Sequence, residues 1–202
     1  MPQNMLQAGE PIADALGRAG IPAGLDVSYR KLWEPERPAL RAHLLRLNEV
    51  DRRLRFFRGA SDEAIHYYCE KINWTGATII GCFIDGELRG VVELIFNRDR
   101  FPRQGEVALS VERPYQATGI GSVLMRMALT AARNRYVSRV YMICLQENRR
   151  MQRLARRFDA ELDVQEGEVE GRIRHPWPSY FSLMEEAASD GRAFMRATFG
   201  VR

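Results

Sequence analysis

The stretch that decides the fold is residues 111–122, which read VERPYQATGIGS. It joins a predicted strand, which ends near Glu112, to a predicted helix that begins near Gly119. Gly119 and Gly121 remove side chains from the entrance of that helix, where unpaired backbone N–H groups and the helix dipole favour an anion. The stretch lacks the third glycine of a dinucleotide fingerprint and the Gly-Lys-Ser/Thr of a P-loop. We therefore expect a diphosphate-binding turn of another kind, with an ordinary glycine-rich strand-to-helix turn as the alternative.

The segments on either side follow a mixed order of strands and helices. The clearest is a hairpin, in which two apolar runs flank Asp85-Gly86, a pair that tolerates the positive φ of a type I′ turn. The continuous apolar run 139–145 predicts a strand covered by helices on both faces. The expected order is strand 27–33, a helix opening at Pro35 and Pro38, a helix after Ser61, strands 77–84, 88–96 and 106–112, helix 119–136, strand 139–145, a helix after Asn148, and strands 162–165 and 169–174. This order predicts a single domain of α+β or mixed α/β class.

The composition is that of a soluble globular protein with a mild basic excess. Of 202 residues, 46% are hydrophobic and 28% are charged, which predicts one domain with one core. The net charge is +4, and of the 30 basic residues only Lys31 and Lys71 are lysines, so the other 28 are arginines. Such a charge suits a phosphorylated cofactor, a nucleic acid or an acidic protein. We expect no nucleic acid, because the chain has no helix-turn-helix, zinc-finger or aromatic RNA-binding pattern.

The cysteines, histidines and chain ends disfavour other classes. Cys69, Cys82 and Cys144 are an odd number without C-x-x-C spacing, which predicts reduced, buried thiols. The three histidines show no metal-ligand spacing, so we expect no metal site. The sequence has no signal-peptide pattern and no apolar run long enough for a membrane span, which predicts a cytoplasmic protein without membrane contact. Residues 1–25 are expected to form an arm, 26–175 the domain, and 176–202 a helical extension.

The region around the glycine turn resembles the GNAT family of acyl-CoA N-acyltransferases. The resemblance lies in a strand, Gln116-x-x-Gly119-x-Gly121, an amphipathic helix, an apolar strand, and Asn148 before a second helix. It extends over about 26–174 and is most specific over 106–158. The stretches Gly105-Glu106-Val107-Ala108 and 148–157 look like the acetyltransferase domain of bacterial protein lysine acetylases, and 53–57 adds weaker support.

The resemblance implies a fold, a cosubstrate and a binding site. The fold would be a GNAT-like single domain with a mostly antiparallel sheet of six to seven strands and helices on both faces. The cosubstrate would be acetyl-CoA. Its pantetheine would pair with the backbone of Leu109, Ser110 and Val111 and contact Asn148, and its pyrophosphate would meet the amides of Gln116, Ala117, Thr118, Gly119, Ile120, Gly121 and Ser122.

Glu106 is the candidate catalytic residue. The resemblance implies a transferase whose acceptor is an amine, with a protein lysine as the first candidate and a small molecule as another. An amine must lose a proton to attack a thioester, and a strand carboxylate can accept it directly or through water. The alternative for Glu106 is a strand glutamate that is solvated or paired with an arginine.

The sequence departs from the family at the expected proton donor. Many members carry a tyrosine where this chain has Ala155, so the candidates for protonating the thiolate are Ser110, Tyr141 and solvent. This departure motivates the alternative function, a non-catalytic acyl-CoA-binding regulatory module. Of the arginines over 149–157, we expect most to form a solvated face, with one as a candidate for the 3′-phosphate.

Overall fold

The computed structural model describes residue 21 and residues 24–97 and 102–174. The predicted arm, 1–25, falls almost entirely outside these residues, and the predicted extension, 176–202, falls entirely outside them. Residues 98–101, between the predicted strands 88–96 and 106–112, also lie outside. The described residues thus cover nearly all of the predicted domain over 26–175.

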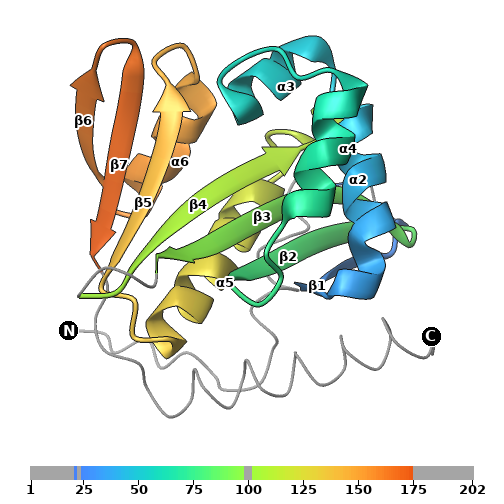
Figure 1. Ribbon diagram of the computed structural model, residues 1–202, viewed down its shortest axis with the longest axis horizontal. Helices are drawn as coiled ribbons and strands as arrows, with labels where there is room; N and C mark the ends of the chain where they lie inside the picture. The colour runs from blue at the N-terminus through green and yellow to red at the C-terminus, as the bar shows by residue number, and fades with distance from the viewer. Residues whose placement is uncertain (1–20, 22–23, 98–101, 175–202) are drawn as a thin grey trace.

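A seven-stranded sheet forms the centre of the molecule, in the order β1-β2-β3-β4-β5-β7-β6 (Figure 1). Neighbouring strands are antiparallel except for β4 and β5, which are parallel. The strands are β1 Val27–Leu32, β2 Ala77–Ile84, β3 Glu87–Asn97, β4 Gln104–Val111, β5 Arg139–Leu145, β6 Glu161–Gln165 and β7 Glu168–Arg174. The predicted α+β class and the mostly antiparallel sheet are confirmed.

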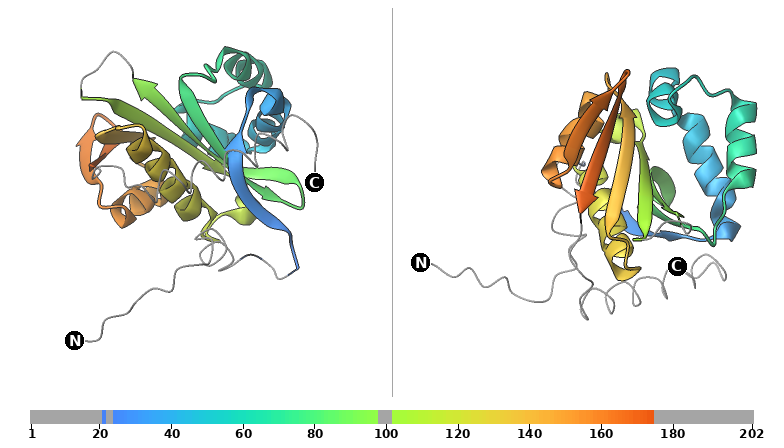
Figure 2. Two further views of the ribbon diagram at one scale, coloured as in Figure 1. Left: turned by 90° about the horizontal axis from the view of Figure 1, so that it is seen from below. Right: turned by 60° about the vertical axis from the view of Figure 1, so that its left-hand side comes forward.

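Helices cover both faces of the sheet (Figure 2). Helices α2 (Arg37–Arg46), α3 (Glu49–Phe56) and α4 (Asp62–Lys71) lie on one face, and α5 (Ile120–Asn134) and α6 (Arg149–Arg157) lie on the other. Short 3₁₀ turns, η1 (Glu34–Glu36) and η2 (Arg113–Tyr115), precede α2 and follow β4. Each face has its own buried apolar cluster. No helix in the described part of the chain is long and apolar enough to cross a membrane.

Local sequence signals account for most of these elements. Asp85 and Gly86 have φ angles of 49° and 81°, as a type I′ turn between β2 and β3 requires. Ser61 caps α4, since its side chain accepts a hydrogen bond from the Ala64 N–H. Cys69, Cys82 and Cys144 are free, buried thiols, as predicted, and burial raises the pKa of Cys69 to about 11.

Helix α3 is absent from the expected order, which has two helices before the hairpin where the structure has three. Its sequence is mostly charged, and Val50 is 56% exposed. The segment therefore has no apolar periodicity that would predict a helix. Polar contacts hold it instead. The side chain of Asn48 accepts from the Asp51 N–H at 2.9 Å, and Arg52 Nε donates to the Leu47 carbonyl at 2.9 Å.

Strand β5 is not covered on both faces, contrary to expectation. Val140, Met142 and Cys144 are buried, but Tyr141 and Ile143 on the opposite face are only half-buried. The apolar run therefore reflects one face in the core and one face that lines a cavity, described below.

Candidate functional site

Strand β4 loses its partner on one edge halfway along its length. The parallel pairing with β5 covers only Gln104–Glu106, opposite 139–141. Beyond Glu106 the two strands diverge, as Figure 1 shows at the top of the sheet. The remaining half of β4 is paired on its β3 side alone.

The hydrogen-bond alternation shows which backbone groups face this gap. The Arg103 carbonyl accepts from the Ser138 N–H at 3.0 Å, toward β5, whereas the Glu112 N–H donates to the Arg89 carbonyl at 2.9 Å, toward β3. Because polar groups alternate sides along a strand, the N–H and C=O of Leu109 and Val111 point into the gap, and those of Ser110 point to β3. Gln116 Nε2 donates to the Val111 carbonyl at 2.9 Å. An extended ligand chain can pair with the groups that remain, as an added strand does.

The glycine turn sits at the end of this edge. Gly119 caps α5 with φ 96°, and Ala117, two residues earlier, has φ 63°. A left-handed alanine costs about 1–3 kcal/mol, and alternation of left-handed residues turns successive backbone N–H groups toward one side, a geometry that binds anions. The Thr118 hydroxyl donates to the Tyr115 carbonyl at 2.7 Å and stabilises the turn.

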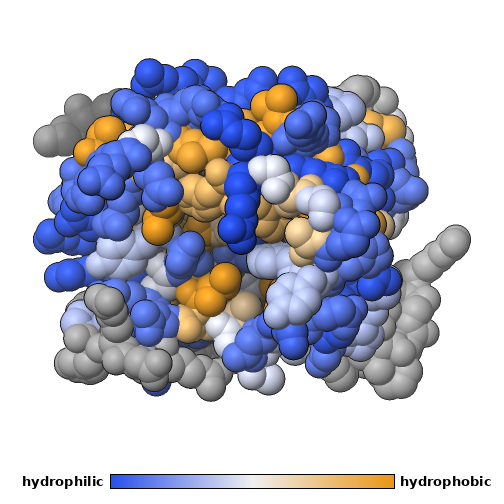
Figure 3. Space-filling view, turned by 45° about the horizontal axis from the view of Figure 1, so that its top comes forward, coloured by the Kyte–Doolittle hydropathy of each residue, from blue (hydrophilic) through white to orange (hydrophobic). Residues whose placement is uncertain are grey.

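A cleft of about 310 Å³ lies over the gap and the turn. The face where β4 and β5 diverge is hollowed, with a hydrophobic floor and a hydrophilic rim (Figure 3). The predicted binding residues that line the cleft are Leu109, Ser110, Val111, Gln116, Ala117, Gly119, Gly121, Ser122 and Asn148. The side chains of Thr118 and Ile120 do not line it, because both are buried beneath the turn.

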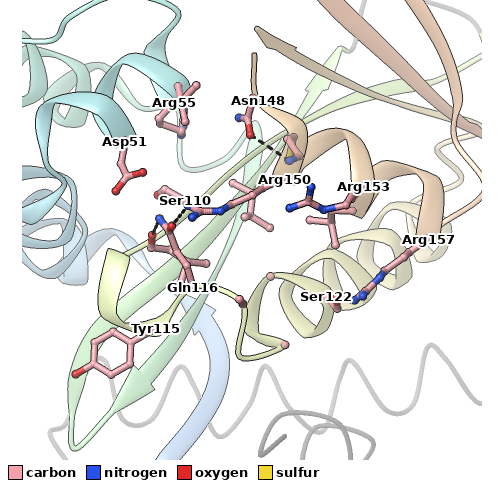
Figure 4. Close-up of a pocket in the computed structure, with 18 residues that line it drawn as sticks. Asp51, Arg55, Ser110, Tyr115, Gln116, Ser122, Asn148, Arg150, Arg153 and Arg157 are labelled. Atoms are coloured by element: carbon pink, nitrogen blue, oxygen red, sulfur yellow. Dashed lines mark hydrogen bonds between the residues drawn. The ribbon is translucent and has the colours of Figure 1, made fainter. Parts of the chain in front are cut away.

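Helix α6 supplies positive charge to the cleft. Arg150, Arg153 and Arg157 line it and are spaced i, i+3 and i+7, so they share one helix face. Figure 4 shows Arg150 reaching across to hydrogen-bond Gln116 Oε1. All five arginines of this helix are exposed, as expected, and these three also line the cleft.

Asn148 caps α6 and lines the same cleft. Its Oδ1 accepts from the Met151 N–H at 3.1 Å, a bond that satisfies the start of the helix. The oxygen is thereby engaged, and the amide NH₂ is the group that can donate to a ligand.

A buried polar chain supports β4 from behind. His43, on α2, is completely buried, with Nδ1 3.1 Å from Glu112 Oε1 and Nε2 3.0 Å from Ser110 Oγ. Arg46 Nε and Arg89 Nη1 each donate to Glu112 at 2.9 Å. The chain ties α2 and β3 to the end of β4, in the half of the strand that is unpaired on its β5 side.

Burial fixes the protonation of this chain. It lowers the pKa of His43, even though Glu112 opposes the shift. Burial alone would raise the pKa of Glu112, but hydrogen bonds from His43 and Arg46 outweigh it and the net shift is downward. An ionised Glu112 accepts from Nδ1–H of a neutral His43, so Nε2 accepts from the Ser110 hydroxyl. Neither a sequence motif nor metal-ligand spacing points to His43; its signal is its place on the apolar face of α2 with Leu40 and Leu44.

A buried ion pair separates the cleft from a second cavity. Arg55 lines the cleft, and its Nη2 donates to Glu93 Oε1 at 2.5 Å. The Tyr68 hydroxyl donates to Glu93 Oε2 at 2.6 Å, and both Glu93 and Tyr68 line the second cavity. Burial acts to lower the pKa of Arg55, but the charge of Glu93 outweighs it and raises that pKa.

Glu106 lies in the second cavity, which has a volume of about 1020 Å³. Its side chain is exposed rather than buried within the sheet. It is the last β4 residue paired with β5, opposite Tyr141, which lines the same cavity. Leu109 is three residues further on, about 10 Å along the strand. The strand therefore carries Glu106 in one cavity and the unpaired edge in the other.

Comparisons with known proteins agree with this geometry. Three solved structures share the fold: the GNAT domain of PAT from S. lividans (TM-score 0.64, 18% identity, 74% of this chain and 90% of that chain); PaiA N-acetyltransferase from Thermoplasma acidophilum in complex with coenzyme A (0.57, 16%, 74% and 99%); and YncA from Salmonella typhimurium with its cofactor acetyl-CoA (0.56, 14%, 77% and 99%). No curated protein matches the chain by sequence.

A family model supplies the assignment that these distant structures do not. The model described as the acetyltransferase (GNAT) family matches residues 42–160, which is more than half of the chain. The matched segment contains the glycine turn, the divergent strands β4 and β5, and helix α6. The chain therefore belongs to the acetyltransferase (GNAT) family.

Proposed function

We propose that this protein is an N-acetyltransferase that moves the acetyl group of acetyl-CoA directly to an amine, with Glu106 as general base. One observation carries the proposal: the unpaired edge of β4 runs from the glycine turn, in the cleft, toward Glu106, in the second cavity. A thioester held along this edge would have its phosphates at one end and a carboxylate near the other.

The cleft suits acetyl-CoA in shape and charge. The N–H and C=O of Leu109 can pair with the pantetheine amides, and the amides at the start of α5 suit the pyrophosphate. A Cβ added to Gly121 would lie 3.7 Å from the Leu109 side chain and 3.8 Å from that of Leu154, so glycine keeps the space between β4 and α6 open. The arginines of α6 face the same space and complement phosphate charge.

The second cavity suits the acceptor. At pH 7 only about one alkyl amine in 2,500 is neutral, given a pKa near 10.4, which is a cost of about 4.6 kcal/mol. Glu106 can take the proton as nitrogen attacks, directly or through water. Backbone N–H groups that face the gap can donate to the thioester oxygen as negative charge develops on it.

The leaving group places a small demand on the site. A thiolate with a pKa near 8.5 departs without a strong acid. Tyr141 is the better placed of the two candidate side-chain donors, because it lines the cavity opposite Glu106. The Ser110 hydroxyl hydrogen is engaged by His43.

The acceptor that we propose first is the side chain of a protein lysine. The support is the resemblance of Gly105-Glu106-Val107-Ala108 and of the glycine turn to bacterial protein lysine acetylases. The carboxylates of Glu93, Glu106 and Glu170 line the second cavity and favour a cationic acceptor.

Glu106→Gln tests the assignment. Thiol release from acetyl-CoA is measured with a panel of amines and lysine peptides, and acetyl-CoA affinity is measured by isothermal titration calorimetry. We expect kcat to fall by about 10²–10⁴-fold with the dissociation constant nearly unchanged. The matched control is Glu168→Gln, an exposed β7 residue outside both cavities, which should keep wild-type turnover. Retention of full turnover by Glu106→Gln would remove Glu106 from this role, and lack of acetyl-CoA binding by folded wild type would refute the proposal as a whole.

A non-catalytic acyl-CoA-binding regulatory module is the second candidate. It is favoured by Ala155, which is 1% exposed and offers no hydroxyl where many family members have a tyrosine. This function predicts acetyl-CoA binding by calorimetry together with no thiol release for any acceptor in the panel.

A further inference from the structure

Lys71 lies in the same cavity as Glu106. It is one of two lysines in the chain, and it is the exposed last residue of α4. Among the described residues that line the cavity it is the sole cation, and it faces a set of three carboxylates. The chain's own amine thus occupies the space in which an acceptor amine is expected.

The contacts of the three carboxylates single out Glu106. Glu93 is bound by Arg55, and Glu170 is bound by Arg172 at 3.0 Å. Glu106 has no ion-pair partner among residues 24–97 and 102–174, and the same holds for Lys71. An ammonium and a carboxylate, neither of them in an ion pair, therefore share one cavity. Their opposite charges attract each other, which favours movement of Lys71 toward Glu106.

The Lys71 ammonium is free to move toward Glu106. Nζ lies 5.4 Å from the centroid of the Tyr67 ring, and Tyr67 is 67% exposed. A cation–π contact at an exposed site contributes only about 0.5–1 kcal/mol. Exposed side chains change rotamer in picoseconds to nanoseconds, so this contact does not hold Nζ away from the cavity.

We propose that Nζ of Lys71 is acetylated within the same molecule by this site, an inference that rests on the proposed function. Glu106 accepts a proton from the ammonium, and the neutral nitrogen attacks the thioester carbonyl carbon of acetyl-CoA. The N–C bond forms and the C–S bond breaks. The thiolate leaves with the electron pair and takes up a proton, which yields acetyllysine and the free thiol. The modification removes the cationic charge from the described lining of the cavity.

Lys31 provides an internal comparison. It lies on β1, is half-buried with Nζ 4.1 Å from the Trp33 ring centroid, and does not line the cavity. Because Lys31 is less exposed than Lys71, uncatalysed acetylation would also favour Lys71, so dependence of the modification on Glu106 is what identifies catalysis by the site. Intramolecular transfer is first order in protein, so its rate constant should not depend on protein concentration.

The test is a time course of full-length protein with acetyl-CoA, read by intact mass and peptide mapping. We expect one acetyl group on the peptide containing Lys71, none on Lys31, and a first-order rate constant that stays the same across a dilution series. Lys71→Arg should abolish the modification, Lys31→Arg should leave its rate unchanged, and Glu106→Gln should slow it at least about 100-fold. Circular dichroism of each variant checks that it is folded.

Four results would overturn the inference. Labelling of Lys71 in Glu106→Gln at the wild-type rate indicates uncatalysed chemistry, and a rate constant that rises with protein concentration indicates transfer between copies. Turnover of added amines with Lys71 unmodified refutes self-acetylation and leaves the proposed function in place. Calorimetric binding of acetyl-CoA with no transfer to any amine refutes both.

Discussion

The buried ion pair between Arg55 and Glu93 lies between the two cavities, and its contribution to the free energy of unfolding can be measured directly. Arg55→Met keeps the length of the side chain and removes its charge. The side chains of Arg55 and Glu93 are 8% and 2% exposed, so the variant leaves a buried carboxylate whose remaining hydrogen-bond donor among the described side chains is the Tyr68 hydroxyl. Removing one partner of such a pair costs about 3–5 kcal/mol.

The double variant separates the charge from the packing. Arg55→Met with Glu93→Leu removes both charges, and the residual cost should be about 1–3 kcal/mol, because the Tyr68 hydroxyl then lacks its acceptor. The double variant should therefore be more stable than Arg55→Met alone. Arg156→Met, at an exposed position of α6 outside the cleft, is the matched control and should change stability by less than about 0.5 kcal/mol.

Urea unfolding followed by tryptophan fluorescence measures these differences. With a slope of about 2 kcal/mol per molar urea, a loss of 3–5 kcal/mol moves the midpoint down by about 1.5–2.5 M. A loss below about 1 kcal/mol for Arg55→Met, or a double variant no more stable than the single one, would show that the pair is solvated rather than buried.

Two further predictions concern the support of the site. Burial lowers the pKa of His43 below its ordinary 6.5. As pH falls below 6.5, His43 therefore becomes protonated in the unfolded chain but stays neutral in the folded one. The free energy of unfolding should decline by up to about 1.4 kcal/mol per pH unit over this range. His43→Gln should flatten this decline in urea midpoints taken between pH 7.5 and 5.5, and a wild-type midpoint that is constant over that range would contradict the assignment. Asn148→Ala removes the acceptor for the Met151 N–H and should cost about 1 kcal/mol in the same assay, whereas Asn148→Ser, which keeps an acceptor, should recover most of it; equal losses for the two variants would mean that the cap is not what Asn148 provides.

Elements with a strong local signal follow the sequence closely. Strand β5 has the predicted bounds, 139–145, and the positive φ angles of Asp85 and Gly86 follow from their turn chemistry. The amphipathic helix after the glycine turn was predicted within two residues of α5. In each case the deciding interactions lie within a few residues of one another, so periodicity and turn propensity are sufficient.

Elements held by distant polar contacts cannot be predicted from the local sequence in this way. The stability of α3 depends on Arg52, Arg55 and their partners on other segments. The spacing of charged residues in α3 does not indicate which distant residues they will contact. The place of Arg150 in the cleft, as part of an arginine face of α6, depends on how α6 packs against β5, β6 and β7. Propensity describes a segment, and these residues are positioned by their neighbours in space.

The sequence by itself determined the family resemblance and the order of the central elements, and it predicts an anion-binding turn at Gly119 and Glu106 as the base. The tertiary structure decided which backbone groups of β4 are unpaired, that His43 joins Ser110 to Glu112, and that Lys71 shares a cavity with Glu106. The physical reason is that turn geometry and periodicity are local properties of the chain. The divergence of β4 from β5 and the burial of charge arise only when segments far apart in sequence pack together.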